Sequence, residues 1–475
     1  MIKTRRKSPS ANPLAFQLEM EPATEMLTGY GGVPLVVQTF RSLSLPEAVQ
    51  QQIHIKERDR GFDEATFVES FVILNAVGGE CLEDFEQLRA DPGLAELIGH
   101  EIPSPEAARK FLYAFHDEEK LQEAQEQLKL GGQASIPGES QRLVGLQAVN
   151  RHLIAGVGAR AGDQKIATVD ADATIIASDK REAKLTYEGS HGYQPMLAVW
   201  AETSLILADE FRDGNVPAHY KPLNVVRAAF QSLPSTVNEY YFRGDASCHE
   251  YELVRWLENQ QRVNGPAGFI GFAISMRVQP SLRKAMMAIA EPEWEQISDE
   301  GELIRCCAEV DFVPEYGAES KNRVPLRVIG IRIQSKQGHL LNGNEAKYFA
   351  VVTNIEDWSA RRLIHWHREK AGTVEQVHDI LKNELAAGVL PCGRFGANAA
   401  WLRLAVLTHN VLTALKRLAL PVDHLWSRPK RLRFLFFNLP GRVVQHARRL
   451  RLRVATLATR IAEFREALDH LPVPA

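Results

Sequence analysis

The chain has 475 residues, of which 45% are hydrophobic and 24% are charged, and its formal net charge at pH 7 is -3. This composition is typical of a globular protein with two or three domains. A membrane-spanning helix needs about 20 uninterrupted apolar residues, and every apolar stretch in this sequence is much shorter. The near-zero charge gives no global sign of nucleic-acid binding, so any such surface must be local. The basic residues at the start of the sequence are not followed by the apolar core of a signal peptide, so we expect a cytoplasmic protein. The five cysteines lack the spacing of zinc ligands, so we expect neither a zinc site nor a disulfide framework.

Residues from about 25 to 130 have helical apolar periodicity, and we assign residues 1–150 to an N-terminal helical region. Within it, Pro103-Ser104-Pro105 predicts a helix start with Ser104 as the N-cap. That helix is either the second of a DNA-reading pair or an ordinary corner of a helical bundle. The stretch Gly131 to Ser140 predicts a boundary, beyond which a short helix leads into strands.

Strict alternation over residues 166–176 predicts a strand on which Thr168, Asp170, Asp172 and Thr174 share one face. Further strands are predicted at 195–201, 204–211, 239–243 and 269–275, with a helix around 225–230. The strand at 239–243 ends at Gly244-Asp245. The next residues, Ser247 to Glu250, have the pattern of a capping box at a helix start.

Later strands are predicted at 308–313, 328–334 and 347–354, and helices are predicted to resume near Trp358 and to dominate to the C-terminus. This order is the layout of an RNase-H-like core, so the predicted fold class is α/β, with a β-rich insertion in the core and helical regions at both ends. The predicted divisions after the N-terminal region are the first part of the core at 151–276, the insertion at 277–346, the second part of the core at 347–390 and a basic helical region at 391–475.

Such a core brings carboxylates together to hold two divalent ions for phosphoryl transfer, and Mg²⁺ suits oxygen ligands of this kind. Asp172 and Asp245 occupy two of the positions required. For the third acid, Glu369, Glu375 and Glu384 all lie near one predicted helix. Glu375 is favoured because it borders the apolar stripe together with Lys382, seven residues further on. The alternative is an exposed Glu and Lys on an ordinary amphipathic helix.

The chain resembles the DDE transposases of bacterial insertion sequences whose RNase-H-like core carries a β-rich insertion. The motifs that carry this resemblance are Thr28–Gly32, Asp170–Thr174, Gly192–Pro195, Arg212–Asn215, Arg243–Asp245, and Arg368–Glu375 with Lys382. The resemblance implies that Asp172, Asp245 and Glu375 form the catalytic, metal-binding triad. It also implies that Arg368 and Lys382 hold DNA phosphate near the cut.

Two features depart from the family pattern. Asp170 lies on the same strand face as Asp172 and is an alternative metal ligand; we favour Asp172 because Thr174 follows it by two residues, as in the family. The family pattern has its basic residue a fixed, shorter distance before the glutamate, whereas Arg368 lies further upstream of Glu375.

A run of basic residues begins at Arg428 and reaches Arg460 without an intervening acid. Such a run is able to neutralise DNA phosphates, and its alternatives are a solvated helical face and a disordered basic tail. The candidate nucleic-acid-binding residues in it are Arg428, Lys430, Arg431, Arg448 and Arg449.

The resemblance implies a transposase that binds the inverted-repeat ends of its element, hydrolyses the DNA there and joins the freed 3′-hydroxyls to target DNA. Mg²⁺ is the expected cofactor, with Mn²⁺ able to substitute. The expected partners are double-stranded DNA and a second copy of the chain in the DNA complex, with no membrane, and the bound protein would associate with the nucleoid. The alternatives are an RNase-H-like nuclease without strand transfer and a DNA-binding relative without catalysis.

Overall fold

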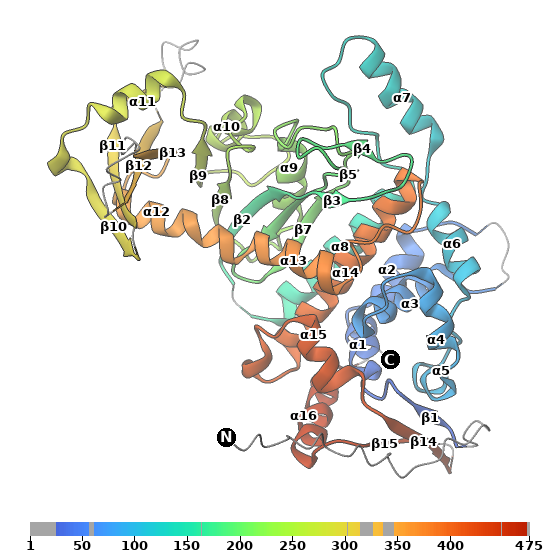
Figure 1. Cartoon of the computed structure of the whole chain (residues 1–475). Helices are drawn as coiled ribbons and strands as arrows, with labels where there is room; N and C mark the ends of the chain where they lie inside the picture. Colours follow the sequence, from blue (N-terminus) through green and yellow to red (C-terminus); the bar gives the residue numbers. More distant parts are fainter. Residues whose placement is uncertain are drawn as a thin grey trace, which may run out of the picture.

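The computed structural model describes residues 25–56, 61–162, 164–301, 303–313, 326–335, 346–447 and 449–472. Within these residues the main feature is a nine-stranded sheet in the order β10-β11-β12-β13-β9-β8-β2-β6-β7 (Figure 1). Its strands are β2 (Ile166–Ala173), β6 (Met196–Trp200), β7 (Leu205–Glu210), β8 (Glu239–Gly244), β9 (Ile270–Met276), β10 (Glu295–Glu300), β11 (Leu303–Val310), β12 (Arg327–Ser335) and β13 (Lys347–Thr353).

The strands β7, β6, β2, β8 and β9 form the core part of this sheet. β2 pairs in parallel with β8, and β8 with β9, whereas β6 pairs antiparallel with both β2 and β7. This order and these directions confirm the predicted RNase-H-like core. β6 and β9, on either side of the central pair β2 and β8, are almost wholly apolar and buried, as expected for strands covered on both faces.

The insertion extends the core sheet. β10, β11 and β12 form an antiparallel series that continues through β13, and β13 pairs with core strand β9. Helix α11 (Pro280–Met287) lies in the same segment and packs its Met286 side chain against Gly330 of β12. The described part of residues 277–346 is therefore β-rich, as predicted. Its strands extend the core sheet beyond β9.

Helices cover both faces of the sheet. α12 (Ala360–Arg368) packs on β9, β10 and β11, and α13 (Val374–Glu384) packs on β2 and β6. In Figure 1 these two helices cross the front of the sheet, while α9 (Leu223–Ser232) lies behind it and α10 (Tyr251–Glu258) lies beside β9. Between α12 and α13 the chain makes a single 3-10 turn, Glu369–Gly372.

The N-terminal and C-terminal regions pack together around one long helix. The N-terminal helices are α1 (Val33–Ser42), α2 (Leu45–Gln52), α3 (Glu64–Val77), α4 (Phe85–Arg89), α5 (Pro92–Ile98), α6 (Pro105–Tyr113), α7 (Glu118–Lys129) and α8 (Gln141–Arg160). Helix α14 (Phe395–Leu418) contacts α1, α3, α6 and α8, and its residues from Gly396 to Leu415 are all buried. The two ends of the chain thus share one hydrophobic core.

The predicted N-cap at Ser104 is confirmed, because its Oγ accepts a hydrogen bond of 3.2 Å from the amide of Ala107. Phe111 and Leu112 of the same helix are buried in the shared core. Burial of this face favours a corner of a helical bundle over a helix that reads DNA.

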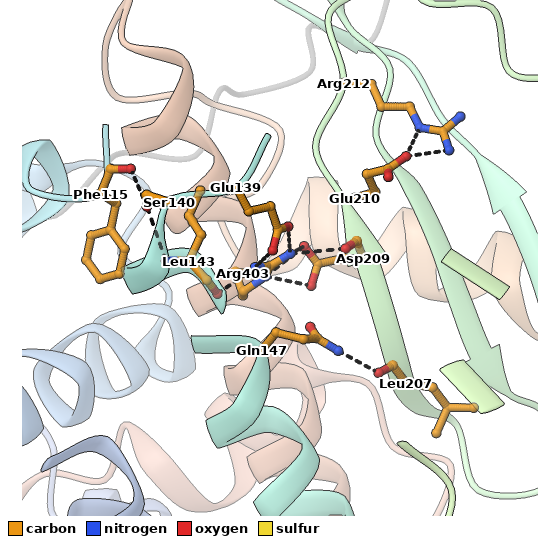
Figure 2. A network of polar contacts seen from close by, with 10 residues as sticks. All are labelled: Phe115, Glu139, Ser140, Leu143, Gln147, Leu207, Asp209, Glu210, Arg212 and Arg403. Carbon is orange, nitrogen blue, oxygen red and sulfur yellow. Dashed lines mark hydrogen bonds and ion pairs between the residues drawn. The ribbon is translucent and has the colours of Figure 1, made fainter. Parts of the chain in front are cut away.

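A buried ion-pair network joins this bundle to the core part of the sheet (Figure 2). Arg403 of α14 donates from Nε to both carboxylate oxygens of Asp209 on β7 at 3.0 Å, and from Nη2 to Glu139 at 2.6 Å. Its Nη1 also donates to the carbonyl of Leu143 in the first turn of α8 at 2.7 Å. Ser140 caps α8, so the predicted boundary stretch ends in fixed structure.

The C-terminal region contains strands where helix was predicted. β14 (Gly441–His446) and β15 (Arg449–Val454) form an antiparallel hairpin, and β14 also pairs with β1 (Leu27–Thr28). The helical prediction holds for α14, α15 (Pro429–Leu432) and α16 (Ala458–Asp469), but it is wrong for these two strands. The physical reason is that arginine and apolar residues alternate along Arg449–Val454 with the period of two that a strand requires. Arg448 lies outside the described residues.

In the part of the chain that the structure describes, no single helix has the length and apolar character needed to cross a membrane. One sharply bent pair, Glu64–Val77 with Leu82–Arg89, meets the length and composition requirement jointly.

Candidate active site

Asp172 and Asp245 lie at the same edge of the sheet. In the parallel pairing of β2 with β8, Asp170 lies opposite Arg243 and Ala171 opposite Gly244. Asp172 therefore lies near the C-terminal end of β2, and Asp245 comes directly after the C-terminal end of β8. The two carboxylates are near enough to interact, since the charge of Asp245 helps to raise the pKa of Asp172.

The pKa of Asp172 is raised to about 6, mainly because the carboxyl is buried and further because Asp245 repels its negative charge. Lys370 opposes this shift: its Nζ lies 3.4 Å from Asp172 Oδ2. Burial lowers the pKa of Lys370, but the nearby carboxylates of Asp172 and Asp245 outweigh burial and the net pKa is raised. Asp172, Asp245 and Lys370 thus form one coupled, largely buried group of charges.

Lys370 was not identified from the sequence. The sequence analysis took Arg368 as the basic residue that precedes Glu375 and holds DNA phosphate, but Arg368 is the last residue of α12 and has an exposed side chain. The 3-10 turn after α12 rotates the chain so that Lys370 points inward and is 7% exposed. Its position within the motif Arg368–Glu375 was the available signal, but spacing alone did not show which basic side chain faces the acids.

Asp170 is held by a different set of partners. It is fully buried and accepts from Arg243 through Nε at 2.6 Å and through Nη2 at 2.8 Å. The hydroxyl of Thr373, immediately before α13, also donates to it. These bonds occupy both carboxylate oxygens of Asp170, whereas Asp172 on the same strand face keeps its carboxylate toward Lys370.

Arg243 connects the acid-bearing strands to the segment that carries Lys370. Its Nη1 donates to the carbonyl of Trp366 at 2.6 Å and to Glu369 at 3.2 Å. Its guanidinium also lies over the Trp366 ring, 5.2 Å from the ring centroid. The pair Arg243–Asp170 therefore ties β2 and β8 to the end of α12.

The turn after Asp245 differs from the predicted capping box. Asp245 Oδ1 accepts from both the amide and the hydroxyl of Ser247, so Ser247 is not the N-cap. Helix α10 begins at Tyr251, and Glu250 caps it by accepting from the amides of Glu252 and Leu253, each at 2.9 Å. The Ser247 bonds instead fix the orientation of the Asp245 carboxylate.

Glu375 lies in the first turn of α13 with an exposed side chain. Further along the same border, His378 is buried with neither ring nitrogen bonded to a described residue, and burial together with Lys382 lowers its pKa to about 3. Lys382 Nζ donates a hydrogen bond of 2.9 Å to Oγ1 of Thr174, which follows Asp172 by two residues. Within the described residues no group of three or more His, Cys, Asp or Glu side chains has the arrangement of a metal site.

Comparison with known proteins gives the family. A model described as "Transposase DDE domain group 1" matches residues 15–473. The chain belongs to this family of transposases. None of the curated protein sequences with which it was compared matches it. Among solved structures, the chain is similar to the piggyBac transposase in a cryo-EM synaptic complex with hairpin DNA, at 10% identity and a TM-score of 0.44, over 87% of this chain and 82% of that chain.

Membership of the family implies that this transposase depends on divalent metal ions. The donor chemistry at the sheet edge fits a hard cation, since Asp172 and Asp245 offer carboxylate oxygens and Mg²⁺ commonly binds through one or two carboxylates plus substrate phosphates. A cation there would also favour the ionised form of Asp172, which burial disfavours.

The candidate DNA-binding residues have different surroundings in this transposase. Arg428 is engaged within the protein, because its Nε donates to Glu384 at 2.6 Å and its Nη2 donates to Asp379. These bonds fasten α15 to α13. Lys430 and Arg431 on α15 and Arg449 on β15 have exposed side chains.

Proposed function

We propose that this transposase binds the inverted-repeat ends of an insertion sequence, hydrolyses the DNA strands there and joins the freed 3′-hydroxyls to target DNA. The observation that carries this proposal is the placement of Asp172 and Asp245 at one edge of the parallel pair β2 and β8, with Lys370 beside them. Paired carboxylates at such an edge suit phosphoryl transfer, in which charge on the attacking and leaving oxygens must be stabilised.

In this proposal Asp172, Asp245 and Glu375 hold Mg²⁺, for which Mn²⁺ substitutes. The bound ions would activate the attacking oxygen and stabilise the leaving one. Ser247 orients Asp245 through its amide and hydroxyl. The choice of Asp172 over Asp170 is supported by the bonds that Arg243 and Thr373 make to both oxygens of Asp170.

Basic side chains would hold the DNA at the cut. Lys382 lies beside Thr174, close in sequence to Asp172, and Arg368 is exposed at the end of α12. Both are proposed to contact phosphates flanking the reacting one, and the exposed basic residues of the C-terminal region would bind DNA further away. Action on both element ends implies that a second copy of the chain joins the complex.

The test is a cleavage and strand-transfer assay with duplexes taken from the DNA that flanks the gene. Wild-type protein with Mg²⁺ should nick these ends and, given pre-cut ends, join their 3′-hydroxyls to a plasmid. Asp245→Asn should bind the same duplex and neither cut nor join it. Cleavage without joining by the wild type would indicate a nuclease, binding without cleavage a catalytically inactive relative, and cleavage by Asp245→Asn would overturn the site.

A further inference from the structure

The hairpin of β14 and β15 carries its positive charges on one face. Its register places Arg442 opposite Arg453, Val444 opposite Arg451, and His446 opposite Arg449. Residues directly opposite each other in an antiparallel pair project from the same face. The arginine face of the hairpin therefore carries Arg442, Arg449, Arg451 and Arg453, together with His446 and Val444.

The other face of the hairpin is apolar at its base and packs there against the protein. At the base it carries Val443, Leu452 and Val454, and Val443 is 4% exposed, whereas Gln445 and Leu450 on the same face are exposed. Val454 and Leu452 also lie close to Gly31, at the start of the N-terminal helices. The hairpin is thus anchored by one face, and the arginine face is turned toward solvent, with Arg442, Arg449, Arg451 and Arg453 all exposed.

Within the described residues, most of these arginines form no ion pair. Arg449, Arg451 and Arg453 form no ion pair with any described residue, and Arg442 Nη1 lies 4.0 Å from Glu25 Oε1, the outer limit of such a pair. Like charges directly opposite in a sheet destabilise it, so the pair Arg442–Arg453 opposes folding unless an anion binds there. Local arrangements that oppose stability in this way are typical of functional sites.

A groove borders the base of the hairpin. It has a volume of about 590 Å³, and Arg442 and Arg453 line it together with Thr28 and Asp91. Asp91 accepts from the Thr28 hydroxyl at 3.0 Å and from the Gly29 amide at 2.8 Å, so these neutral donors hold its carboxylate in place. In Figure 1 the hairpin lies at the end of the molecule remote from β10 to β13.

We propose that the arginine face binds the phosphate backbone of duplex DNA, as a clamp remote from the cut. The inference rests on the proposed function, since the DNA is that on which the transposase acts. A continuous row of phosphates suits a row of arginines, because each guanidinium binds phosphate with two parallel hydrogen bonds. A two-stranded ribbon also has dimensions that a DNA groove admits. Arg428, which is committed to Asp379 and Glu384, is not part of this surface.

The test measures DNA affinity of the full chain by fluorescence anisotropy over a series of salt concentrations. The probes are a duplex from the element end and a shuffled duplex of equal length. The triple variant Arg449→Gln, Arg451→Gln, Arg453→Gln should bind both probes more weakly, and the slope of log K against log salt should shrink by about 0.9 for each phosphate that is no longer neutralised. The matched control, with lysine at the same three positions, should keep the wild-type slope because the charge remains.

A folding defect is separable from weaker DNA binding. The glutamine variant removes like-charge repulsion, so its thermal midpoint at low salt should equal or exceed that of the wild type. An unchanged affinity and slope in this variant, while the wild type cuts its ends, would overturn the clamp alone. Loss of binding in the lysine variant, or loss for one probe only, would overturn backbone recognition. Wild-type protein that binds neither probe would overturn both the clamp and the proposed function.

Discussion

The ammonium nitrogen of Lys370 lies 3.4 Å from Asp172 Oδ2, near the end of β2. Both side chains are largely buried, so their interaction is weakly screened by salt. Lys370 therefore neutralises part of the charge of the Asp172 and Asp245 carboxylates from within the protein. Lys370 is thus a buried counter-ion of the two acids, whereas the exposed Arg368 is proposed to contact DNA phosphate.

Lys370→Met should destabilise the protein, because it leaves the buried carboxylates without their cation. The expected loss is roughly 1–3 kcal/mol of unfolding free energy in urea denaturation without divalent ions. Saturating Ca²⁺ should restore more of the stability in this variant than in the wild type. Arg368→Met, at an exposed position, is the control and should change the unfolding free energy by less than about 0.5 kcal/mol. Equal effects of the two substitutions would contradict the buried role of Lys370.

Asp170→Asn and Asp172→Asn should separate structure from chemistry. Asp170→Asn leaves the buried Arg243 guanidinium without its bidentate partner, and removal of one partner of a buried pair costs about 3–5 kcal/mol. Asp172→Asn should abolish strand cleavage. It should leave the urea midpoint at pH 7 near or above that of the wild type, because the raised pKa means that the folded state disfavours the charged carboxylate that the substitution removes. A stable Asp170→Asn protein that fails to bind Mn²⁺ would reverse the assignment.

The pKa of Asp172 near 6 sets the sign of a pH effect. The folded carboxyl holds its proton more tightly than the ordinary group at 3.8, so between these values the folded state binds more protons and unfolding free energy falls as pH rises. The shift corresponds to roughly 3 kcal/mol without divalent ions, and Asp172→Asn should remove this slope. Urea denaturation from pH 4 to 7 measures it; parallel curves for the two proteins would contradict the raised pKa.

The raised pKa of Asp172 should also make metal affinity depend on pH, with affinity increasing as pH rises. Because a proton and a cation compete for Asp172, Mn²⁺ affinity should fall as pH drops below about 6. Calorimetric titration of the wild type at pH 5 and pH 7 checks this. The same affinity at both values would place the ion away from Asp172.

Glu375→Gln should lower strand cleavage by more than about 100-fold, since loss of a residue that only supports a metal ligand already costs 10–100-fold. Glu369→Gln is the matched control on the preceding turn, with a side chain 67% exposed, and it should keep activity within a few-fold. DNA affinity measured without metal should change little in either variant. Normal cleavage by Glu375→Gln would require another third acid.

The sequence determined the features that depend on local periodicity. Alternation over residues 166–176 predicted β2 and the shared face of Asp170 and Asp172, and strand signals ahead of Asp245 located it at a sheet edge. The N-cap at Ser104 also followed from neighbouring residues. The helical prediction for β14 and β15 was wrong because it took no account of the alternation of arginine and apolar residues along Arg449–Val454.

Tertiary structure decided which polar side chains meet. Asp170 and Asp172 are equivalent by pattern, and their roles differ because Arg243 and Thr373, distant in sequence, bind the first and Lys370 faces the second. The direction of Lys370 depends on one 3-10 turn. The pairing of β14 with β15, and not the content of the basic run, puts its arginines on one face. Side-chain partners of this kind are fixed by long-range packing, which local periodicity does not encode.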